Sequence, residues 1–193
     1  MILYRLLERA NFRGITGWLY RVKISGAENI PSAGPVILVA NHESMFDPWL
    51  LALATPRPVR YMAKAELWRV SLLGRILDAF GAFPVERGAG DGSAMSRAAS
   101  LLHAGEVIGI FPQGTSKQLP ERPLHRGAAR LALVTGAPLV PVRLVGTRGF
   151  PGLRRRSTKV LVGEPIVVEP AKPTVAAARA LTARIEQGIE AAT

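Results

Sequence analysis

The sequence Val36-Ile37-Leu38-Val39-Ala40-Asn41-His42-Glu43-Ser44-Met45-Phe46-Asp47-Pro48 joins an unbroken apolar run to a largely polar one. The apolar part predicts a strand covered on both faces, and Val107-Ile108-Gly109-Ile110-Phe111 repeats the pattern. Such strands are typical of sheets that are at least partly parallel and carry helices on both sides. The polar part then follows a strand end, where α/β sheets place their ligands. This stretch therefore predicts an α/β fold and the position of its site.

The rest of the chain alternates β-rich runs with helical segments. The predicted strands are Val22–Ser25, Val36–Ala40, Val59–Met62, Phe83–Glu86, Val107–Phe111, Leu139–Leu144 and Lys159–Val162. The predicted helices are Pro48–Ala54, Glu66–Leu77, Ser93–His103, Gly127–Thr135 and Thr174–Ala191, with Ser93 and Thr174 as candidate caps. This order predicts a single α/β domain with a mostly parallel or mixed central sheet flanked by helices.

Composition limits the class of protein and its partners. The 193 residues are 48% hydrophobic, which fits one globular domain with a sizeable core. Lys and Arg number 25 against 14 Asp and Glu, and the formal charge of +11 favours phosphates, nucleic acid or an anionic membrane as partners. The absence of cysteine excludes disulfides, thiolate zinc sites and cysteine nucleophiles. The longest apolar stretch, 131–146, is interrupted by Pro138, Pro141 and Arg143, so no membrane-spanning helix is predicted.

Residues 1–21 are predicted to form an amphipathic helical segment ahead of a domain over 22–193. Apolar residues recur there largely at i, i+3 and i+4 with arginines between them: Ile2, Leu3, Leu6, Leu7, Ala10, Ile15, Trp18 and Leu19. A core helix and a helix on a membrane surface fit this pattern equally well. The segment lacks the unbroken apolar region and cleavage site of a signal peptide, so exposure to the cytosol is expected.

His42 and Asp47 are the first candidate catalytic residues. They lie five residues apart directly after the apolar strand, and a tight turn between them can bring the carboxylate to the imidazole. A carboxylate at that position fixes the tautomer of the imidazole and raises its basicity, so His42 becomes a candidate general base. The alternative is a histidine with a purely structural role, whose hydrogen bonds are satisfied within the fold.

The turn Phe111-Pro112-Gln113-Gly114-Thr115-Ser116-Lys117 follows the second apolar strand. Gly114 permits close approach of the backbone, and the amides of Gly114, Thr115 and Ser116 are candidates to bind an anion or a developing oxyanion. An ordinary β-turn is the alternative.

Two cations also follow predicted strands. Lys64 comes after the strand at 59–62, and Arg87 follows the strand at 83–86. Side chains at neighbouring strand ends can converge on one phosphate, with Arg as a bidentate fork and Lys as a point charge. Taken singly, each is more simply a solvated surface charge.

Together these residues resemble the glycerolipid acyltransferase family. The matching blocks are His42-x4-Asp47, Lys64-x2-Leu67-x6-Gly74-x12-Arg87, the Phe-Pro-x-Gly-Thr turn at 111–115 and the Leu-Val-Pro-Val segment at 139–142. They occur in the order and spacing of that family, and the similarity spans residues 22 to about 168. Four ordered blocks make the resemblance specific.

The resemblance implies a glycerol-3-phosphate acyltransferase-like fold and an O-acyltransferase of the 1-acylglycerol-3-phosphate type. A fatty acyl group would pass from acyl-CoA or acyl carrier protein to the hydroxyl of a lysophospholipid acceptor, giving phosphatidate. His42 would be the general base and Asp47 would stabilise the imidazolium, with no acyl-enzyme, cofactor or metal. The phosphate of the acceptor would bind Lys64 and Arg87. The protein would be peripheral on the cytoplasmic face of the cell membrane, where the N-terminal segment and Arg154–Arg156 would contact anionic lipid.

The chain departs from the family pattern in the third block. The usual Phe-Pro-Glu-Gly-Thr-Arg-Ser stands here as Phe-Pro-Gln-Gly-Thr-Ser-Lys, so Gln113 replaces a carboxylate and Ser116 replaces an arginine. Gln113 can hydrogen-bond but cannot act as a base. Lys117 restores the positive charge only if the turn directs it inward. A phosphate-bearing acceptor remains favoured, and a different lipid or alcohol acceptor or a non-catalytic lipid-binding protein is the alternative.

Two further classes fit less well. Nucleic-acid binding is disfavoured because only 6% of residues are aromatic and no RNP, KH or helix-turn-helix pattern is present. A metal hydrolase built on His42, Asp47, His103 and His125 is disfavoured because His103 and His125 lack ligand-like spacing.

Overall fold

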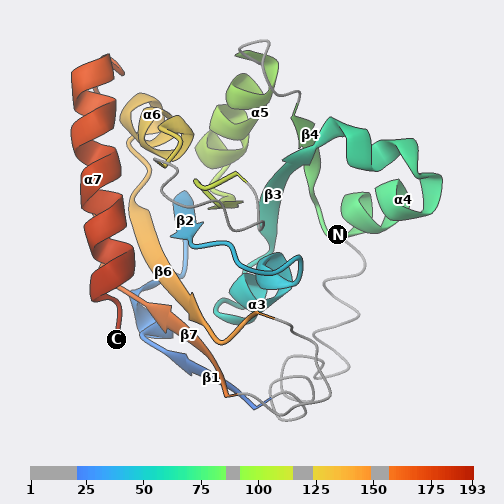
Figure 1. The fold of residues 1–193 in the computed structure, drawn as a ribbon. Helices are drawn as coiled ribbons and strands as arrows, with labels where there is room; N and C mark the ends of the chain where they lie inside the picture. The colour runs from blue at the N-terminus through green and yellow to red at the C-terminus, as the bar shows by residue number, and fades with distance from the viewer. Residues whose placement is uncertain (1–20, 86–91, 115–123, 149–156) are drawn as a thin grey trace.

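A seven-stranded mixed sheet forms the centre of the domain (Figure 1). The computed structural model describes residues 21–85, 92–114, 124–148 and 157–193, so all but the last residue of the predicted helical segment 1–21 lies outside the described residues. The strands are β1(Val22–Ser25), β2(Val36–Ala40), β3(Val59–Lys64), β4(Phe83–Val85), β5(Val107–Ile110), β6(Leu139–Val145) and β7(Thr158–Val162). The helices are η1(Ala27–Asn29), α3(Asp47–Leu53), η2(Ala65–Arg69), α4(Ser71–Ala79), α5(Gly92–His103), α6(Gly127–Thr135) and α7(Val175–Ala191).

The strand order is β1-β7-β6-β2-β5-β3-β4. The five strands from β6 to β4 are parallel, whereas β7 pairs antiparallel with β6 and β1 pairs parallel with β7. This confirms the predicted α/β class and the mixed sheet. The parallel strands all finish at one edge of the sheet, here called the carboxyl edge. Loops that follow β2, β5, β3 and β6 therefore meet there, as in other open α/β sheets.

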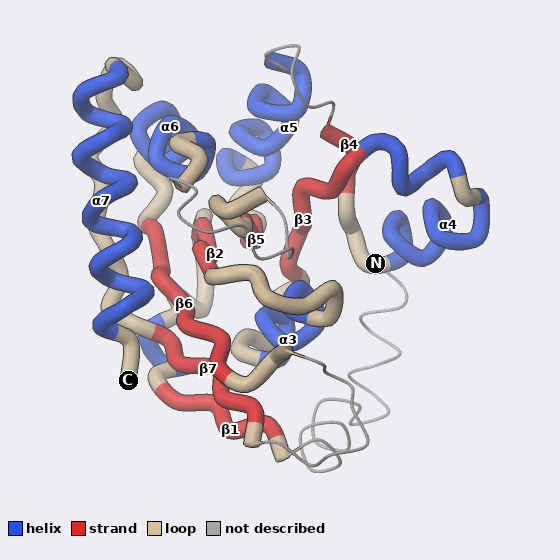
Figure 2. Tube along the Cα trace, viewed as in Figure 1, coloured by secondary structure: helices blue, strands red, loops and turns tan. Residues whose placement is uncertain are grey.

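Helices cover both faces of the sheet, as Figure 2 shows. The side chains of Ile37 and Val39 pack in a core cluster with α5, α6 and α7, while Val36, Leu38 and Ala40 pack in a second cluster with α3. All five residues of β2 are fully buried. This two-sided burial is the reason that the strand has no polar residue and no alternation in its sequence.

One predicted helix is wrong in its extent. Instead of a helix over 66–77, the chain forms the short helix η2, an extended residue at Val70 and then α4. The indole Nε1 of Trp68 donates to Asp78 Oδ1 at 2.9 Å. In a continuous helix these residues would be about 15 Å apart along the axis, so the break at Val70 is what allows the bond.

Most other boundaries agree with the sequence to within two residues. Thr174 caps α7 as predicted, because its hydroxyl accepts from the amide of Ala177 at 3.2 Å. Ser93 does not cap α5 from outside, since that helix already begins at Gly92. None of the helices in the described residues has both the length and the apolarity needed to cross a bilayer.

Candidate active site

His42 and Asp47 meet at the carboxyl edge, in the loop between β2 and α3. His42 Nδ1 lies 2.8 Å from Asp47 Oδ2. The side chain of His42 is 17% exposed and that of Asp47 is fully buried. The predicted contact therefore forms, and it leaves the imidazole accessible from solvent while its partner is shielded.

The loop backbone fixes the Asp47 carboxylate. Oδ2 also accepts from the amides of Glu43, at 2.6 Å, and Ser44, at 2.8 Å. Asp47 is the first residue of α3, where the positive end of the helix dipole stabilises an anion. Its other oxygen, Oδ1, is buried and has no hydrogen-bond partner among the described residues. The carboxylate is thus held through one oxygen.

Two residues at the end of β5 hold His42 from the other side. Its ring stacks on Phe111 with centroids 4.4 Å apart, and its backbone amide donates to Gln113 Oε1. Phe111 in turn stacks against Tyr61, whose hydroxyl donates to the Pro48 carbonyl at 2.6 Å. These contacts bind the loop of β2, the end of β5 and the start of α3 into one unit.

Gly109 makes room for this stack. A Cβ at that position would lie 2.4 Å from Tyr61 Cε1 and 3.1 Å from a methyl of Val59. Any side chain at residue 109 would therefore displace the ring that supports Phe111, and the apolar run of β5 contains a glycine for this reason.

The end of β6 contacts the same loop at two points. Asn41 Nδ2 donates to the Leu144 carbonyl at 2.9 Å, and Asn41 Oδ1 accepts from the Leu144 amide at 2.7 Å. Arg148 forms an ion pair with Glu43, with Nε 3.3 Å from Oε2. Sequence reasoning missed Asn41 and the pair of Arg148 with Glu43, because each contact joins segments more than 100 residues apart.

The other predicted site residues divide between described and undescribed segments. Lys64 ends β3 and is exposed, and its partner in the register is Val85. Arg87 follows two residues later, outside the described residues, as do Thr115, Ser116 and Lys117. Gly114 is described: it has φ 71° and its amide donates to the Phe111 carbonyl at 3.0 Å. Because that amide is used inside the turn, the predicted anion contact would depend on Thr115 and Ser116.

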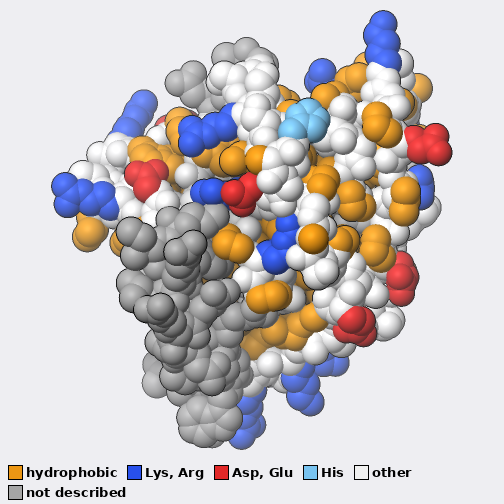
Figure 3. Space-filling view, turned by 180° about the vertical axis from the view of Figure 1, so that it is seen from behind, with side chains coloured by type: hydrophobic (Ala, Val, Ile, Leu, Met, Phe, Trp, Pro, Cys, Tyr) orange, Lys and Arg blue, Asp and Glu red, His pale blue; other side chains and the backbone are white. Residues whose placement is uncertain are grey.

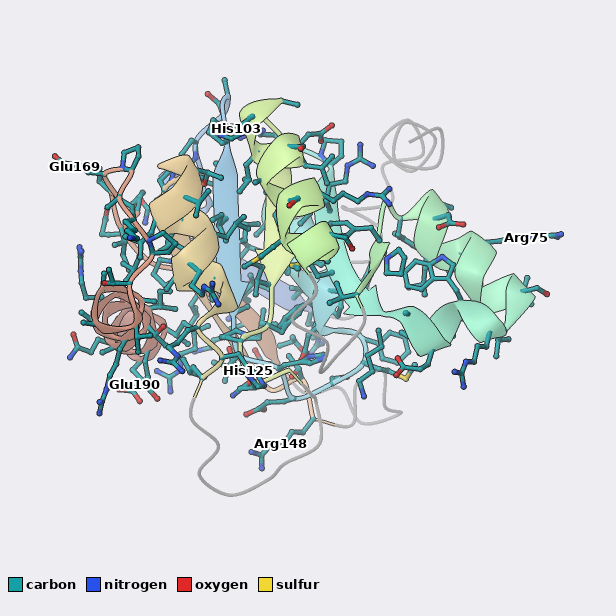
Figure 4. All side chains as sticks on the ribbon, turned by 90° about the horizontal axis from the view of Figure 1, so that it is seen from above. Arg75, His103, His125, Arg148, Glu169 and Glu190 are labelled. Atoms are coloured by element: carbon teal, nitrogen blue, oxygen red, sulfur yellow. The ribbon has the colours of Figure 1, made fainter. Side chains whose placement is uncertain are left out.

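The histidines of the metal-hydrolase alternative do not come together. Figure 4 shows His125 at the edge that carries Arg148, while His103 lies at the opposite edge, at the end of α5. Among the described residues, no group of three or more His, Cys, Asp or Glu is arranged to hold a metal ion.

Chemically, the site is an imidazole whose Nδ1 is already bound to a carboxylate. With the Asp47 carboxylate accepting a hydrogen bond from Nδ1–H, the neutral ring presents its lone pair at Nε2. The same carboxylate stabilises the imidazolium that forms when Nε2 takes a proton. The arrangement suits the removal of a proton from a hydroxyl or a similar group.

Replacing Gln113 tests its structural role. Gln113→Leu leaves the His42 amide without its acceptor, so we expect a loss of about 1–3 kcal/mol in unfolding free energy and a lower kcat. Gln113→Glu keeps an oxygen at that place and should retain stability. Thermal unfolding and turnover of both variants measure these effects. Equal stability of Gln113→Leu and the unmodified protein would show that Gln113 does not stabilise the loop of His42.

Comparisons with known proteins identify relatives of this chain. A family model described as Acyltransferase matches residues 21–145. The 1-acyl-sn-glycerol-3-phosphate acyltransferase of Bacillus subtilis is 34% identical over 75% of this chain and 73% of that protein. The enzyme of the same name from Borreliella burgdorferi is 33% identical, over 70% of this chain and 56% of that protein. The crystal structure of the 1-acyl-sn-glycerophosphate acyltransferase from Thermotoga maritima superposes with a TM-score of 0.63 and 25% identity, covering 88% of this chain and 70% of that one.

Proposed function

Because the chain belongs to the acyltransferase family, we propose that it transfers a fatty acyl group from acyl-CoA or acyl carrier protein to the free hydroxyl of 1-acylglycerol-3-phosphate, giving phosphatidate. The contact of 2.8 Å between His42 and Asp47 carries the proposal, because it supplies the base that an O-acyltransferase needs. The names of the relatives support the acceptor. A direct transfer also fits a chain that contains no cysteine.

In the proposed mechanism, His42 Nε2 takes the proton of the acceptor hydroxyl as its oxygen attacks the thioester carbonyl. The carbon–oxygen bond forms, and the carbonyl oxygen becomes an oxyanion. When the intermediate collapses, the carbon–sulfur bond breaks and the leaving thiolate takes the proton from His42. Asp47 stays ionised throughout and stabilises the imidazolium between the two proton transfers. No acyl-enzyme forms.

We assign the acceptor phosphate to Lys64 and Arg87. The register pairs Lys64 with Val85, so the chain after β4 begins beside the end of β3. β3 is separated from β2 by β5 alone, which places Lys64 roughly 10 Å across the sheet from the base. The acceptor carries its free hydroxyl and its phosphate on neighbouring carbons, and the long side chain of Lys64 can span part of the remaining distance.

Arg87→Ala is expected to raise KM for 1-acylglycerol-3-phosphate by tenfold or more, while kcat changes little. The physical reason is the loss of a charge-assisted hydrogen bond, which contributes about 1.5–3 kcal/mol. Steady-state kinetics with monoacylglycerol, which has no phosphate, provides the control. An equal rise in KM for both acceptors would remove the phosphate assignment.

We further propose that the protein is peripheral on the cytoplasmic face of the membrane, because its acceptor is a lipid and its formal charge is +11. The segment between β3 and β4 supports this placement. Its side chains Leu67, Val70, Leu72 and Ile76 are exposed, and Arg69 and Arg75 lie among them in the sequence. Figure 3 shows hydrophobic and basic side chains next to one another at the end of the molecule that carries α4, on the left.

The experiment that tests the function is a transfer assay with purified protein. Labelled acyl-CoA and acyl-ACP serve as donors, and 1-acylglycerol-3-phosphate, a neutral lysolipid and a simple alcohol serve as acceptors. Phosphatidate is the expected product. Exclusive transfer to a neutral acceptor would favour the second candidate, an acyltransferase for another lipid, which Gln113 and Ser116 suggest. Lipid binding without any transfer would overturn the enzymatic proposal.

A further inference from the structure

Arg148 is a cation beside the loop that carries His42, and the proposed mechanism gives it no role. It follows β6 at the carboxyl edge, where Figure 4 shows its side chain reaching outward from the sheet. Its guanidinium forms two contacts with the Glu43 carboxylate, from Nε at 3.3 Å and from Nη2 at 3.5 Å. Glu43 is the residue directly after His42, so this guanidinium lies beside the loop that carries the base.

The backbone before Arg148 is well anchored. Asn41 fixes Leu144 through two hydrogen bonds, and Thr147 is fully buried. Gly146 has φ 76°, and a Cβ there would lie 2.7 Å from the Ser157 carbonyl, so the chain turns tightly at this point. Arg148 is therefore an exposed side chain on a fixed backbone, which is the arrangement expected of a binding group.

The contact with Glu43 is the type that a stronger ligand displaces. Both distances exceed the 2.7–2.9 Å that is usual for charge-assisted hydrogen bonds. The side chains are also accessible, with 60% of Arg148 and 29% of Glu43 exposed. Exposed ion pairs of this kind contribute little to stability. A phosphate presents two oxygens with more negative charge to the planar guanidinium of Arg148. The released carboxylate of Glu43 can then turn to solvent.

We propose that Arg148 binds a phosphate group of one of the two substrates, which replaces Glu43 on the guanidinium. The inference rests on the proposed function, since it assigns a binding residue to the same site. The strand order distinguishes Arg148 from the acceptor cation Lys64: β6 and β3 lie on opposite sides of β2. Two substrates that react at His42 approach from different sides, so this position favours the phosphates of the acyl donor.

Equilibrium binding without turnover is the first test. Coenzyme A probes the donor and glycerol 3-phosphate probes the acceptor, each titrated by calorimetry into the full chain. Arg148→Ala should weaken the binding of one of the two probes about tenfold or more and leave the binding of the other unchanged. The probe that is affected identifies the source of the phosphate. Arg179→Ala, on the exposed side of α7, removes the same charge and should change neither. If Arg148→Ala changes the affinity for neither probe, or if neither probe binds the unmodified protein, the proposal fails.

Glu43→Gln separates binding from positioning of the loop. If Glu43 competes with phosphate, this variant should strengthen binding of the same probe about two- to fivefold, opposite to Arg148→Ala. If the ion pair only positions the loop of His42, both variants should lower kcat and leave binding unchanged, which would overturn the proposal. Arg148→Lys should fall between, because it keeps the charge and loses the fork.

Turnover then identifies the phosphate on the donor. Arg148→Ala should raise KM for acyl-CoA and leave KM for acyl-pantetheine, which lacks phosphate, unaltered. Equal changes with both donors, combined with unchanged binding of glycerol 3-phosphate, would overturn the assignment. Because the binding experiments need no reaction, they remain decisive even if the unmodified protein transfers no acyl group.

Discussion

Replacing His42 with alanine is expected to lower acyl transfer by about 10³-fold or more, which brings it close to the limit of detection. The variant loses the general base, a function that contributes about 10²- to 10⁴-fold, and the acceptor hydroxyl is a poor nucleophile without it. The fold should persist, because His42 is partly exposed and its amide, which bonds Gln113, remains in alanine. Initial rates with saturating acyl-CoA and 1-acylglycerol-3-phosphate measure the effect.

A second histidine provides the matched control for this variant. His103 lies at the opposite edge of the sheet, at the exposed end of α5, so His103→Ala should retain full activity. Thermal unfolding of both variants shows whether the domain is intact. Turnover by a folded His42→Ala protein at more than a tenth of the normal rate would exclude His42 as the base.

Asp47→Asn is expected to reduce kcat about 10²- to 10⁴-fold with little loss of stability. The asymmetry of the carboxylate is the reason. Oδ2 receives the contacts from His42, Glu43 and Ser44, whereas Oδ1 has no hydrogen-bond partner among the described residues. An asparagine can place its oxygen at the Oδ2 position and its amide nitrogen at the Oδ1 position. The loop and the tautomer are kept, and only the negative charge that stabilises the imidazolium is removed.

Asp47→Ala separates the charge from the geometry. It removes the acceptor of two backbone amides in a buried loop, so the unfolding free energy should fall by about 1–3 kcal/mol for each unsatisfied group. Chemical denaturation of the two variants measures the difference, and stopped assays measure kcat. If Asp47→Asn transfers acyl groups at the normal rate, Asp47 has only a structural role.

Much of the fold could be predicted from local patterns. The unbroken apolar run of β2 requires burial on both faces, and the alternation of strands and helices then leaves few architectures. The extent of the helix after β3 could not be predicted this way. The break at Val70 accompanies a bond between Trp68 and Asp78, which forms only after the chain has folded back.

The contact between His42 and Asp47 was predictable because both residues belong to one turn. His42 and Asp47 are five residues apart, and the geometry of a short loop after a strand brings them into contact. The contacts that hold this loop in place join residues that are far apart in the sequence. Gln113 is 71 residues from the amide it binds, Asn41 is 103 residues from Leu144, and Arg148 is 105 residues from Glu43.

Those three contacts depend on the strand order, which no local pattern encodes. β5 and β6 become the neighbours of β2 because burial of the whole sheet selects that arrangement, although neither strand is adjacent to β2 along the chain. The contact between His42 and Asp47 could therefore be predicted from the sequence, since both residues lie in one short loop. Only the packing of distant strands into one sheet decides which side chains hold His42, and on which side of His42 the strands of Arg148 and Lys64 lie.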